Sequence, residues 1–201
     1  MARTVFLLSP ASVKGLRARQ MMSPRSNSEA GRLYRSVEGV PLSMAFTHMS
    51  ALYFRGKIGY ALQFAPHSDI FVITPGFGLV PHDWRITEER MRVLRKTEIG
   101  VEVRAYRKPL ERDAKALAET MGPDDQAVIL GSVATGKYVD ILLPIFGERL
   151  RFPSAFAGLG DMARGGLMLR ATRAGRELEY TSLAAPRHRP KGTSGKMPPL
   201  V

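Results

Sequence analysis

The chain of 201 residues contains no cysteine, which excludes a disulfide framework and a thiolate metal site. Its amino terminus offers only a short apolar run, Val5–Leu8, too short for a signal-peptide core or a membrane span. The four histidines show no ligand spacing such as H-x-x-x-H, and no G-x-S-x-G motif is present. We therefore expect no metal, no cofactor and no membrane partner, and the composition is compatible with a reducing cytoplasm.

Acidic residues are scarce relative to basic ones. Thirty lysines and arginines face eighteen aspartates and glutamates, so the net charge is +12 and the isoelectric point is near 10.5. Such a balance favours a polyanionic partner, because neutralised phosphates release counterions and give affinity that is independent of nucleotide sequence. The alternative is a source organism whose proteins are generally rich in arginine. A nucleic acid is the partner that the charge predicts.

Short apolar runs alternate with helical patterns along the chain. Residues 4–9, 70–75 and 127–132 are typical of buried strands, and residues 44–65, 84–98, 109–121 and 138–146 of helices. This order predicts an α/β fold with three layers, in which helices flank a mostly parallel central sheet. We expect the helical stretch 44–65 to break near Gly56 or Gly59, and residues 101–106 and 150–153 to form further strands.

The carboxyl-terminal part has two distinct patterns. Residues 167–183, LMLRATRAGRELEYTSL, alternate on both sides of Ala174-Gly175 and predict a β-hairpin. Residues 186–201 are basic and rich in proline and glycine, which is typical of a disordered tail. We therefore expect one α/β domain over residues 1–185, followed by this tail.

The stretch ILGSVATGKYVDILLP contains the spacing G-x-x-x-x-G-K of a nucleotide-binding P-loop, between a predicted strand and a predicted helix. Tyr138 stands where that loop needs a small hydroxyl for magnesium, and no apolar strand ends in the partner aspartate. A P-loop NTPase is therefore disfavoured. Two interpretations stay open: an anion site at the start of the helix, or a tight turn that needs its glycines. The residues concerned are Gly131, Ser132, Thr135, Gly136 and Lys137.

A second loop, ITPGFGLVPHDW, follows the predicted strand at residues 70–75. Phe77 or Trp84 offers a surface for stacking a base, while His82 or Asp83 offers a group that moves a proton. The plain alternative is a rigid turn in which Asp83 caps a helix and Trp84 belongs to the core. As part of a site the loop contributes Thr74, Gly76, Phe77 and Gly78.

Two further stretches combine charge with features of binding sites. Residues 156–166, FAGLGDMARGG, place Asp161 and Arg164 among glycines, which fits either a ligand loop or an exposed flexible one. Residues 51–60 interleave aromatic residues with cations, as nucleic-acid sites do, although their tyrosines also suit a core. The residues named there as binding candidates are Tyr53 and Lys57, and Ser9 joins them from the end of the first strand.

LLSP after the first strand, LYFRGK on the next helix, ITPGFGLVP and the run LLPIFGERLRFPSAFAGLGDMARGGLML together resemble a poorly characterised bacterial family. That family is similar to peroxide-stress DNA-binding proteins and, more remotely, to uracil-DNA-glycosylase-like domains. The resemblance spans Val5 to Leu169. It implies a three-layer α/β fold whose site faces a nucleobase or a nucleic-acid strand. Pro10 departs from the cysteine usual there, and Thr74-Pro75 from a Ser-Ala pair.

The leading hypothesis is a nucleic-acid-binding protein of glycosylase-like type that recognises or processes a base in DNA or RNA. Its alternatives are a non-enzymatic DNA- or RNA-binding stress protein and an enzyme that processes nucleotides with the Gly131–Lys137 turn. The catalytic candidates are Asp161, Asp83 and His82, with Asp140 less favoured. Phosphates would be held by Lys137, Arg164 and Lys57, and a base would stack on Phe77 or Tyr53.

Overall fold

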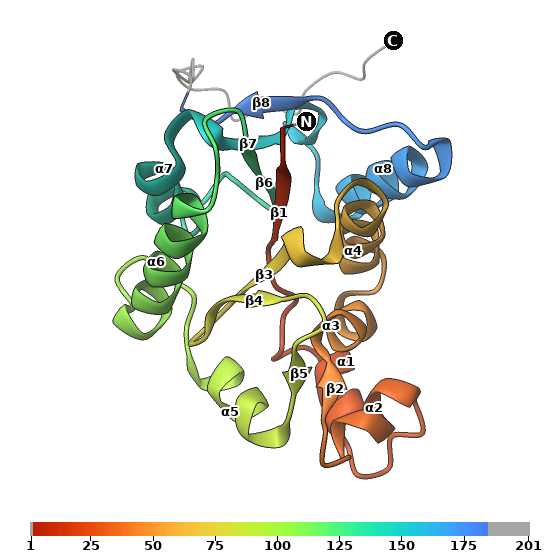
Figure 1. Ribbon diagram of the computed structural model, residues 1–201. Coiled ribbons are helices and arrows are strands. Elements are labelled where there is room, and N and C mark those ends of the chain that lie inside the picture. Colours follow the sequence, from red (N-terminus) through yellow and green to blue (C-terminus); the bar gives the residue numbers. More distant parts are fainter. Residues whose placement is uncertain (1, 185–201) are drawn as a thin grey trace.

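A computed structural model describes residues 2–184 of the chain, and the tail predicted at residues 186–201 lies outside them. The structure is an α/β fold around one six-stranded sheet (Figure 1). Its strands are β1 (Thr4–Leu8), β3 (Ile70–Thr74), β4 (Gly78–Pro81), β6 (Gln126–Leu130), β7 (Leu150–Pro153) and β8 (Tyr180–Ser182), and β2 (Val40–Pro41) with β5 (Arg85–Ile86) forms a small separate sheet. Its helices are α1 (Leu16–Met22), α2 (Glu29–Tyr34), α3 (Leu42–Ser50), α4 (Leu52–Phe64), α5 (Glu88–Lys96), α6 (Arg104–Glu119), α7 (Val139–Phe146) and α8 (Asp161–Ala174).

The sheet has the order β4-β3-β1-β6-β7-β8. β1 pairs in parallel with β3 and β6, and β6 pairs in parallel with β7. The two edge strands, β4 and β8, are antiparallel to their neighbours. This pairing confirms the predicted α/β class with a mostly parallel sheet. Strands that are apolar on both faces require helices to cover both faces.

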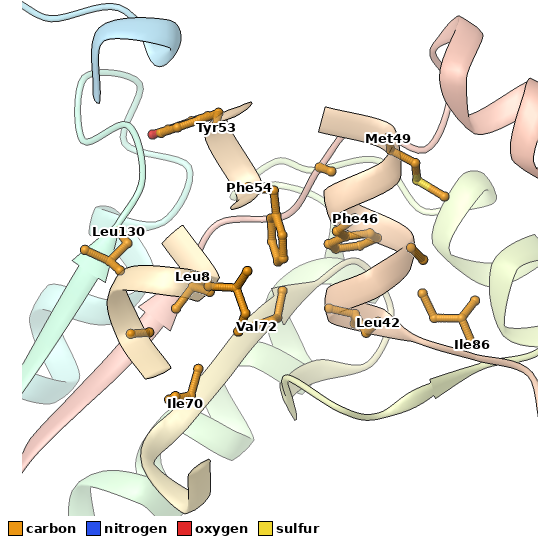
Figure 2. Close-up of a cluster of buried hydrophobic side chains, with 14 of the residues drawn as sticks. Leu8, Leu42, Phe46, Met49, Tyr53, Phe54, Ile70, Val72, Ile86 and Leu130 are labelled. Atoms are coloured by element: carbon orange, nitrogen blue, oxygen red, sulfur yellow. The ribbon is translucent and has the colours of Figure 1, made fainter. Parts of the chain in front are cut away.

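Successive residues of the central strand β1 enter two different cores. Phe6 and Leu8 belong to a cluster with α1, α3, α4 and α8, whereas Val5 and Leu7 belong to a second cluster with α6 and α7. This alternation follows from the period of two in a β-strand. Figure 2 shows part of the first cluster, where the rings of Phe46 and Phe54 meet edge to face with centroids 5.3 Å apart.

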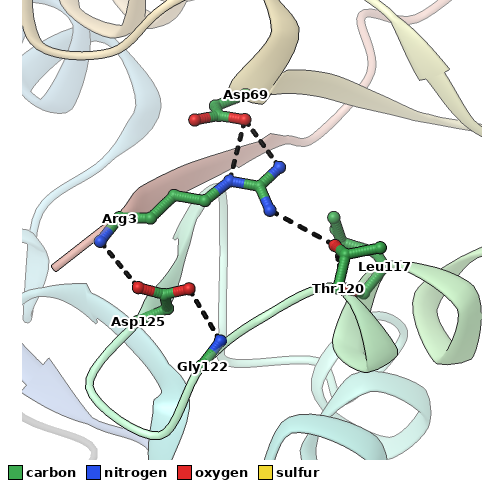
Figure 3. Close-up of polar contacts among 6 residues, drawn as sticks. All are labelled: Arg3, Asp69, Leu117, Thr120, Gly122 and Asp125. Atoms are coloured by element: carbon green, nitrogen blue, oxygen red, sulfur yellow. Dashed lines mark hydrogen bonds and ion pairs between the residues drawn. The ribbon is translucent and has the colours of Figure 1, made fainter.

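The amino ends of the three central strands are joined by one arginine (Figure 3). Arg3 donates from Nε and Nη2 to one carboxylate oxygen of Asp69, at 2.9 and 2.7 Å, and from Nη1 to the Thr120 hydroxyl at 3.2 Å. Its backbone N–H donates to Asp125 at 2.7 Å, and Asp125 also accepts from the N–H of Gly122. These two backbone hydrogen bonds lower the pKa of Asp125.

Removing the Arg3 side chain should destabilise the fold, because the carboxylate of Asp69 is only 10% exposed and would lose its cation. We expect Arg3→Met to lower the free energy of unfolding by about 1–3 kcal/mol, the cost of leaving a buried acceptor unsatisfied. Urea denaturation measures this. The matched control is Arg92→Met, which breaks the exposed Arg92–Glu88 pair and should change stability by less than about 0.5 kcal/mol. Equal effects of the two substitutions would contradict the anchoring role.

Two local expectations were wrong at helices. Residues 104–106 of the expected strand 101–106 open α6, because Tyr106 is buried at helical spacing from Leu110. The stretch 44–65 does break into two helices, but at Ala51, whose φ is +48°, rather than at Gly56 or Gly59. Both glycines lie inside α4.

The expected carboxyl-terminal hairpin was also wrong in its first arm. Residues 167–174 are the last turns of α8, and Gly175, with φ of 59° and ψ of 26°, is the left-handed residue that ends this helix. Gly175 therefore caps a helix instead of turning a hairpin. The second arm does contain a strand, β8, and its partner is β7.

Candidate functional site

A pocket of about 420 Å³ opens at the carboxyl ends of the parallel strands. The loop after β1, Pro75 after β3, and Lys137 and Tyr138 before α7 contribute to its wall. Its lining residues are Pro10, Ala11, Ser12, Val13, Lys14, Phe46, Pro75, Leu94, Thr97, Glu98, Ile99, Lys137, Tyr138 and Asp161. This is the edge at which ligands bind in open α/β sheets, and we call it the carboxyl-edge pocket.

The carboxyl-edge pocket combines apolar walls with charges of both signs. Phe46, Leu94 and Tyr138 supply apolar surface, and Lys14 and Lys137 supply cations. The carbonyl of Lys137 accepts a hydrogen bond of 3.0 Å from the Tyr106 hydroxyl, which fixes the backbone of the turn before α7 to α6. A site of this kind can hold a flat, partly apolar group that carries phosphate.

The Gly131–Lys137 turn has the predicted context, since it joins the buried strand β6 to α7. Only Lys137 among its five candidate residues lines the carboxyl-edge pocket. Gly136 has a φ of 69° and lies against the carboxylate of Asp140, in the first turn of α7. A negative charge therefore already lies near this helix N-terminus and would repel an anion. This favours the interpretation as a tight turn over the anion site.

The loop after β3 is the connection of a β-hairpin between β3 and β4. Gly76 and Gly78 have φ values of 85° and 81°, and the Thr74 hydroxyl donates to the Gly78 carbonyl at 3.0 Å. The Phe77 ring packs on Trp84 with centroids 4.9 Å apart, and both side chains are partly buried against the core. Of the whole loop, Pro75 lines the pocket.

His82 and Asp83 lie at the other end of β3 from this pocket. The backbone N–H of His82 donates to the carbonyl of Ile70, the first residue of β3. The His82 Nε2 lies 3.3 Å from Nδ1 of His67, and burial lowers the pKa of His82. The structure thus separates both residues from Asp161, with which we expected them to share a site.

Asp161 begins α8 and lines the carboxyl-edge pocket. Its carboxylate lies 3.8 Å from Nη1 of Arg164, one turn later in the same helix. The side chain of Arg164 is 11% exposed, and its Nε donates to the Phe156 carbonyl at 3.3 Å. Arg164 therefore interacts with other groups of the protein, whereas we expected its side chain to bind a phosphate of the nucleic acid.

We expected Lys57 to hold a phosphate, but its side chain is buried. It is 1% exposed, and its Nζ donates to the Ser9 carbonyl at 3.0 Å and lies 2.6 Å from the Ser9 hydroxyl. The Nζ also lies 3.8 Å from the centroid of the Tyr53 ring. Burial lowers the pKa of Lys57 from 10.5 to about 7, with Asp161 opposing this effect and Arg164 and Lys137 adding to it.

The structure therefore brings together six of the expected residues around one end of the sheet. They are Ser9, Tyr53, Lys57, Lys137, Asp161 and Arg164. Sequence reasoning missed the lysine–serine pair and the contributions of Lys14, Phe46 and Glu98. A usable signal was present, because Lys57 shares a helical face with Tyr53, Tyr60 and Ala61, all of which are buried.

No group of three or more histidine, aspartate or glutamate side chains within residues 2–184 is arranged to hold a metal ion. Among the helices of the same residues, none combines the length and the apolar character needed to cross a membrane. Comparisons with protein-family models, with curated proteins and with solved structures find no match to this chain. The resemblance stated from the sequence accordingly stays a prediction.

Proposed function

We propose that the protein binds nucleic acid and recognises or processes a single base, in the manner of a glycosylase, with the carboxyl-edge pocket as the base site. The observation that carries this proposal is the composition of that pocket. Apolar walls, two lysines and the carboxylate of Asp161 meet at the carboxyl ends of β1, β3 and β6. A volume of about 420 Å³ suits a nucleobase with part of its sugar.

The charges around the pocket favour a polymer over a free nucleotide. Lys14 lines both the carboxyl-edge pocket and a second hollow, which is built by Met22, Tyr34, Met91, Arg92, Arg95 and Lys96. The two hollows are therefore adjacent, and cations continue from one into the other. A strand whose base enters the first hollow would rest its neighbouring phosphates on α5, as a basic track beside a base pocket allows.

Asp161 is the group that supports base removal. In a glycosylase the C1′–N bond breaks, the base leaves with the electron pair and takes up a proton, and water supplies the hydroxyl to the sugar. A carboxylate beside C1′ stabilises the positive charge that develops there. Asp161 is an acidic residue of the pocket on a helix N-terminus, whereas Asp83 lies beside the first residue of β3.

The test is binding to single- and double-stranded oligonucleotides that carry modified bases, measured by fluorescence anisotropy. The salt concentration is varied over roughly 50–300 mM, because counterion release makes the affinity depend on salt. We expect the affinity to fall steeply with salt. Lys137→Ala should weaken binding to all sequences and reduce the salt slope by about 1. Lys115→Ala, on the exposed face of α6, is the matched control and should change neither. Absence of binding at the lowest salt would refute the proposal.

The same oligonucleotides distinguish an enzyme from a binding protein. Alkali-labile breaks after incubation report abasic products, and Asp161→Asn should abolish them while leaving the affinity within a few-fold. Asp83→Asn should retain them. Binding without breaks on any substrate would instead favour the non-enzymatic DNA- or RNA-binding protein. Thermal stabilisation by mononucleotides, with no affinity for oligonucleotides, would favour the nucleotide-processing enzyme.

A further inference from the structure

The pair formed by Ser9 and Lys57 is unusual because the lysine has no acidic hydrogen-bond partner. Its Nζ is hydrogen-bonded to the carbonyl and hydroxyl oxygens of Ser9, at 3.0 and 2.6 Å. Among the ion pairs of residues 2–184, none involves Lys57. An ammonium group that is buried without a carboxylate is strongly disfavoured, so such lysines lose their proton more readily than exposed ones.

The hydrogen bonds are consistent with a neutral amine. A neutral Nζ has two N–H groups and one lone pair. One N–H donates to the Ser9 carbonyl, and the lone pair can then accept the Ser9 O–H across 2.6 Å. In the ionised form Nζ has no lone pair, so it donates to the Ser9 Oγ at 2.6 Å, and the hydroxyl donates to the Leu130 carbonyl at 3.4 Å. The neutral form thus has the arrangement of a base that removes the serine proton.

Ser9 lies next to the wall of the carboxyl-edge pocket. Ser9 follows β1 directly and precedes Pro10 and Ala11, which line the carboxyl-edge pocket. It retains 5% of its surface, whereas Lys57 retains 1% and lies under the Tyr53 ring. On its other side Ser9 touches Gly131, where an added Cβ would come within 2.8 Å of the Ser9 hydroxyl. The absence of a side chain at this position leaves the hydroxyl room beside the strand end.

We propose that Ser9 and Lys57 form a nucleophile–base pair, and that this pair gives the protein an acyl-transfer activity toward an ester or amide that reaches the carboxyl-edge pocket. The Ser9 Oγ attacks the carbonyl carbon while its proton moves to Lys57 Nζ. The bond to the leaving alcohol or amine breaks, and Lys57 returns the proton to that group. Water then attacks the acyl carbon while Lys57 takes its proton, the bond from Ser9 Oγ to that carbon breaks, the acid leaves, and Lys57 returns the proton to Ser9 Oγ. This activity does not depend on nucleic-acid binding.

The charged and titratable groups around Lys57 come from three elements. Asp161 and Arg164 approach from α8, Lys137 from the turn before α7, and Tyr53 from the preceding turn of α4. Two of the three charged neighbours are cations, so they oppose protonation of the amine, while the carboxylate of Asp161 favours it. Titration of the amine therefore sets the pH at which Ser9 becomes reactive, near neutrality.

The test uses a fluorophosphonate probe on the full chain, with intact-mass analysis and peptide mapping. Attack by Ser9 displaces fluoride from phosphorus and leaves a stable serine adduct. We expect a single adduct at Ser9, formed at a rate that rises through about pH 7 and then levels off. Lys57→Met should slow labelling by about 100-fold or more, the usual contribution of a general base. Ser36→Ala, which removes an exposed serine just after α2 and outside the pocket, should leave the rate unchanged.

Three results with the wild-type protein would overturn the proposal. They are absence of the adduct at every pH from about 5 to 9, an adduct at another residue, and a rate that rises without a plateau as it does for an ordinary serine hydroxyl. Equal labelling of a folded Lys57→Met protein would do the same. Because no oligonucleotide is present, these results leave the proposed base site untouched. The wild-type pH profile keeps the test decisive even where a variant fails to fold.

Discussion

The stability of the wild-type protein should rise as the pH increases from 7 to 9. Lys57 has a pKa of about 7 in the folded protein and 10.5 when solvated, so the unfolded chain binds more protons between these values. Unfolding then takes up a proton, and raising the pH disfavours it. Over the two pH units the free energy of unfolding should gain about 2 kcal/mol from this residue, since each unit of pKa difference corresponds to about 1.4 kcal/mol.

Lys57→Met isolates this contribution from other titrating groups. Methionine fills much of the same volume without a charge. The stability of the variant relative to wild type should therefore fall by about 2 kcal/mol between pH 7 and pH 9, because only the wild type gains. Urea denaturation of both proteins at the two pH values measures the difference. A difference that stays constant with pH would mean that Lys57 is ionised in the folded protein, with an ordinary pKa.

Gly56→Ala should destabilise the protein, whereas Gly59→Ala, three residues later in the same helix, should not. A Cβ on Gly56 would lie 2.7 Å from the carbonyl oxygen of Gly165 and 3.0 Å from its Cα, where α4 crosses α8. These are backbone atoms of a packed helix, so the two helices would have to separate. Overpacking of this kind costs about 1–3 kcal/mol.

Gly59 provides the control because a Cβ built there meets no atom within 4 Å. Alanine is favoured over glycine in a helix by about 0.8–1 kcal/mol, so Gly59→Ala should stabilise slightly. Because Gly56→Ala gains the same helix propensity, the two variants should differ by the overpacking cost alone, about 1–3 kcal/mol in free energy of unfolding. Chemical denaturation at constant pH measures both. A loss of stability in Gly59→Ala equal to that in Gly56→Ala would rule out the close crossing of α4 and α8 as the cause.

The crossing of α4 and α8 also bears on the candidate site. α4 carries Lys57 and α8 begins with Asp161, so the small residues at their contact set the distance between the two charged groups. A change at Gly56 should therefore alter the reactivity of Ser9 as well as stability. Neither Gly56 nor Gly165 lines the pocket. An altered reactivity in Gly56→Ala would therefore reflect the positions of Lys57 and Asp161 and not the loss of a reacting group.

Parts of the candidate site followed from local sequence. The apolar runs of β1, β3 and β6 predicted buried strands, and the ends of these strands are where the carboxyl-edge pocket lies. Lys137 and Asp161 were named as site residues, and both line that pocket. His82 and Asp83 were placed with them because they follow a glycine-rich loop. Because β4 runs antiparallel to β3, His82 and Asp83 instead lie beside the first residue of β3, at the end opposite the pocket.

Local patterns failed where one residue type serves two structures. Gly175 is as suitable for a hairpin turn as for the left-handed end of a helix, and the alternation of residues 167–174 did not distinguish strand from helix. In the structure these residues belong to a helix whose amino-terminal half packs closely on α4 at Gly165. The break at Ala51 likewise has no local signal, because alanine rarely adopts a positive φ such as its +48°.

The sequence by itself determined the α/β class, the buried parallel strands, the strongly basic charge and the exclusion of cysteine chemistry. These depend on composition and on periods of two and 3.6 residues, which neighbours along the chain establish. Only the tertiary structure decided that Lys57 is buried against Ser9, 48 positions away, and that Asp161 and Lys137 meet at the same strand ends. Burial and proximity arise from the crossing of elements distant in sequence, and the proton affinity of Lys57 depends on both.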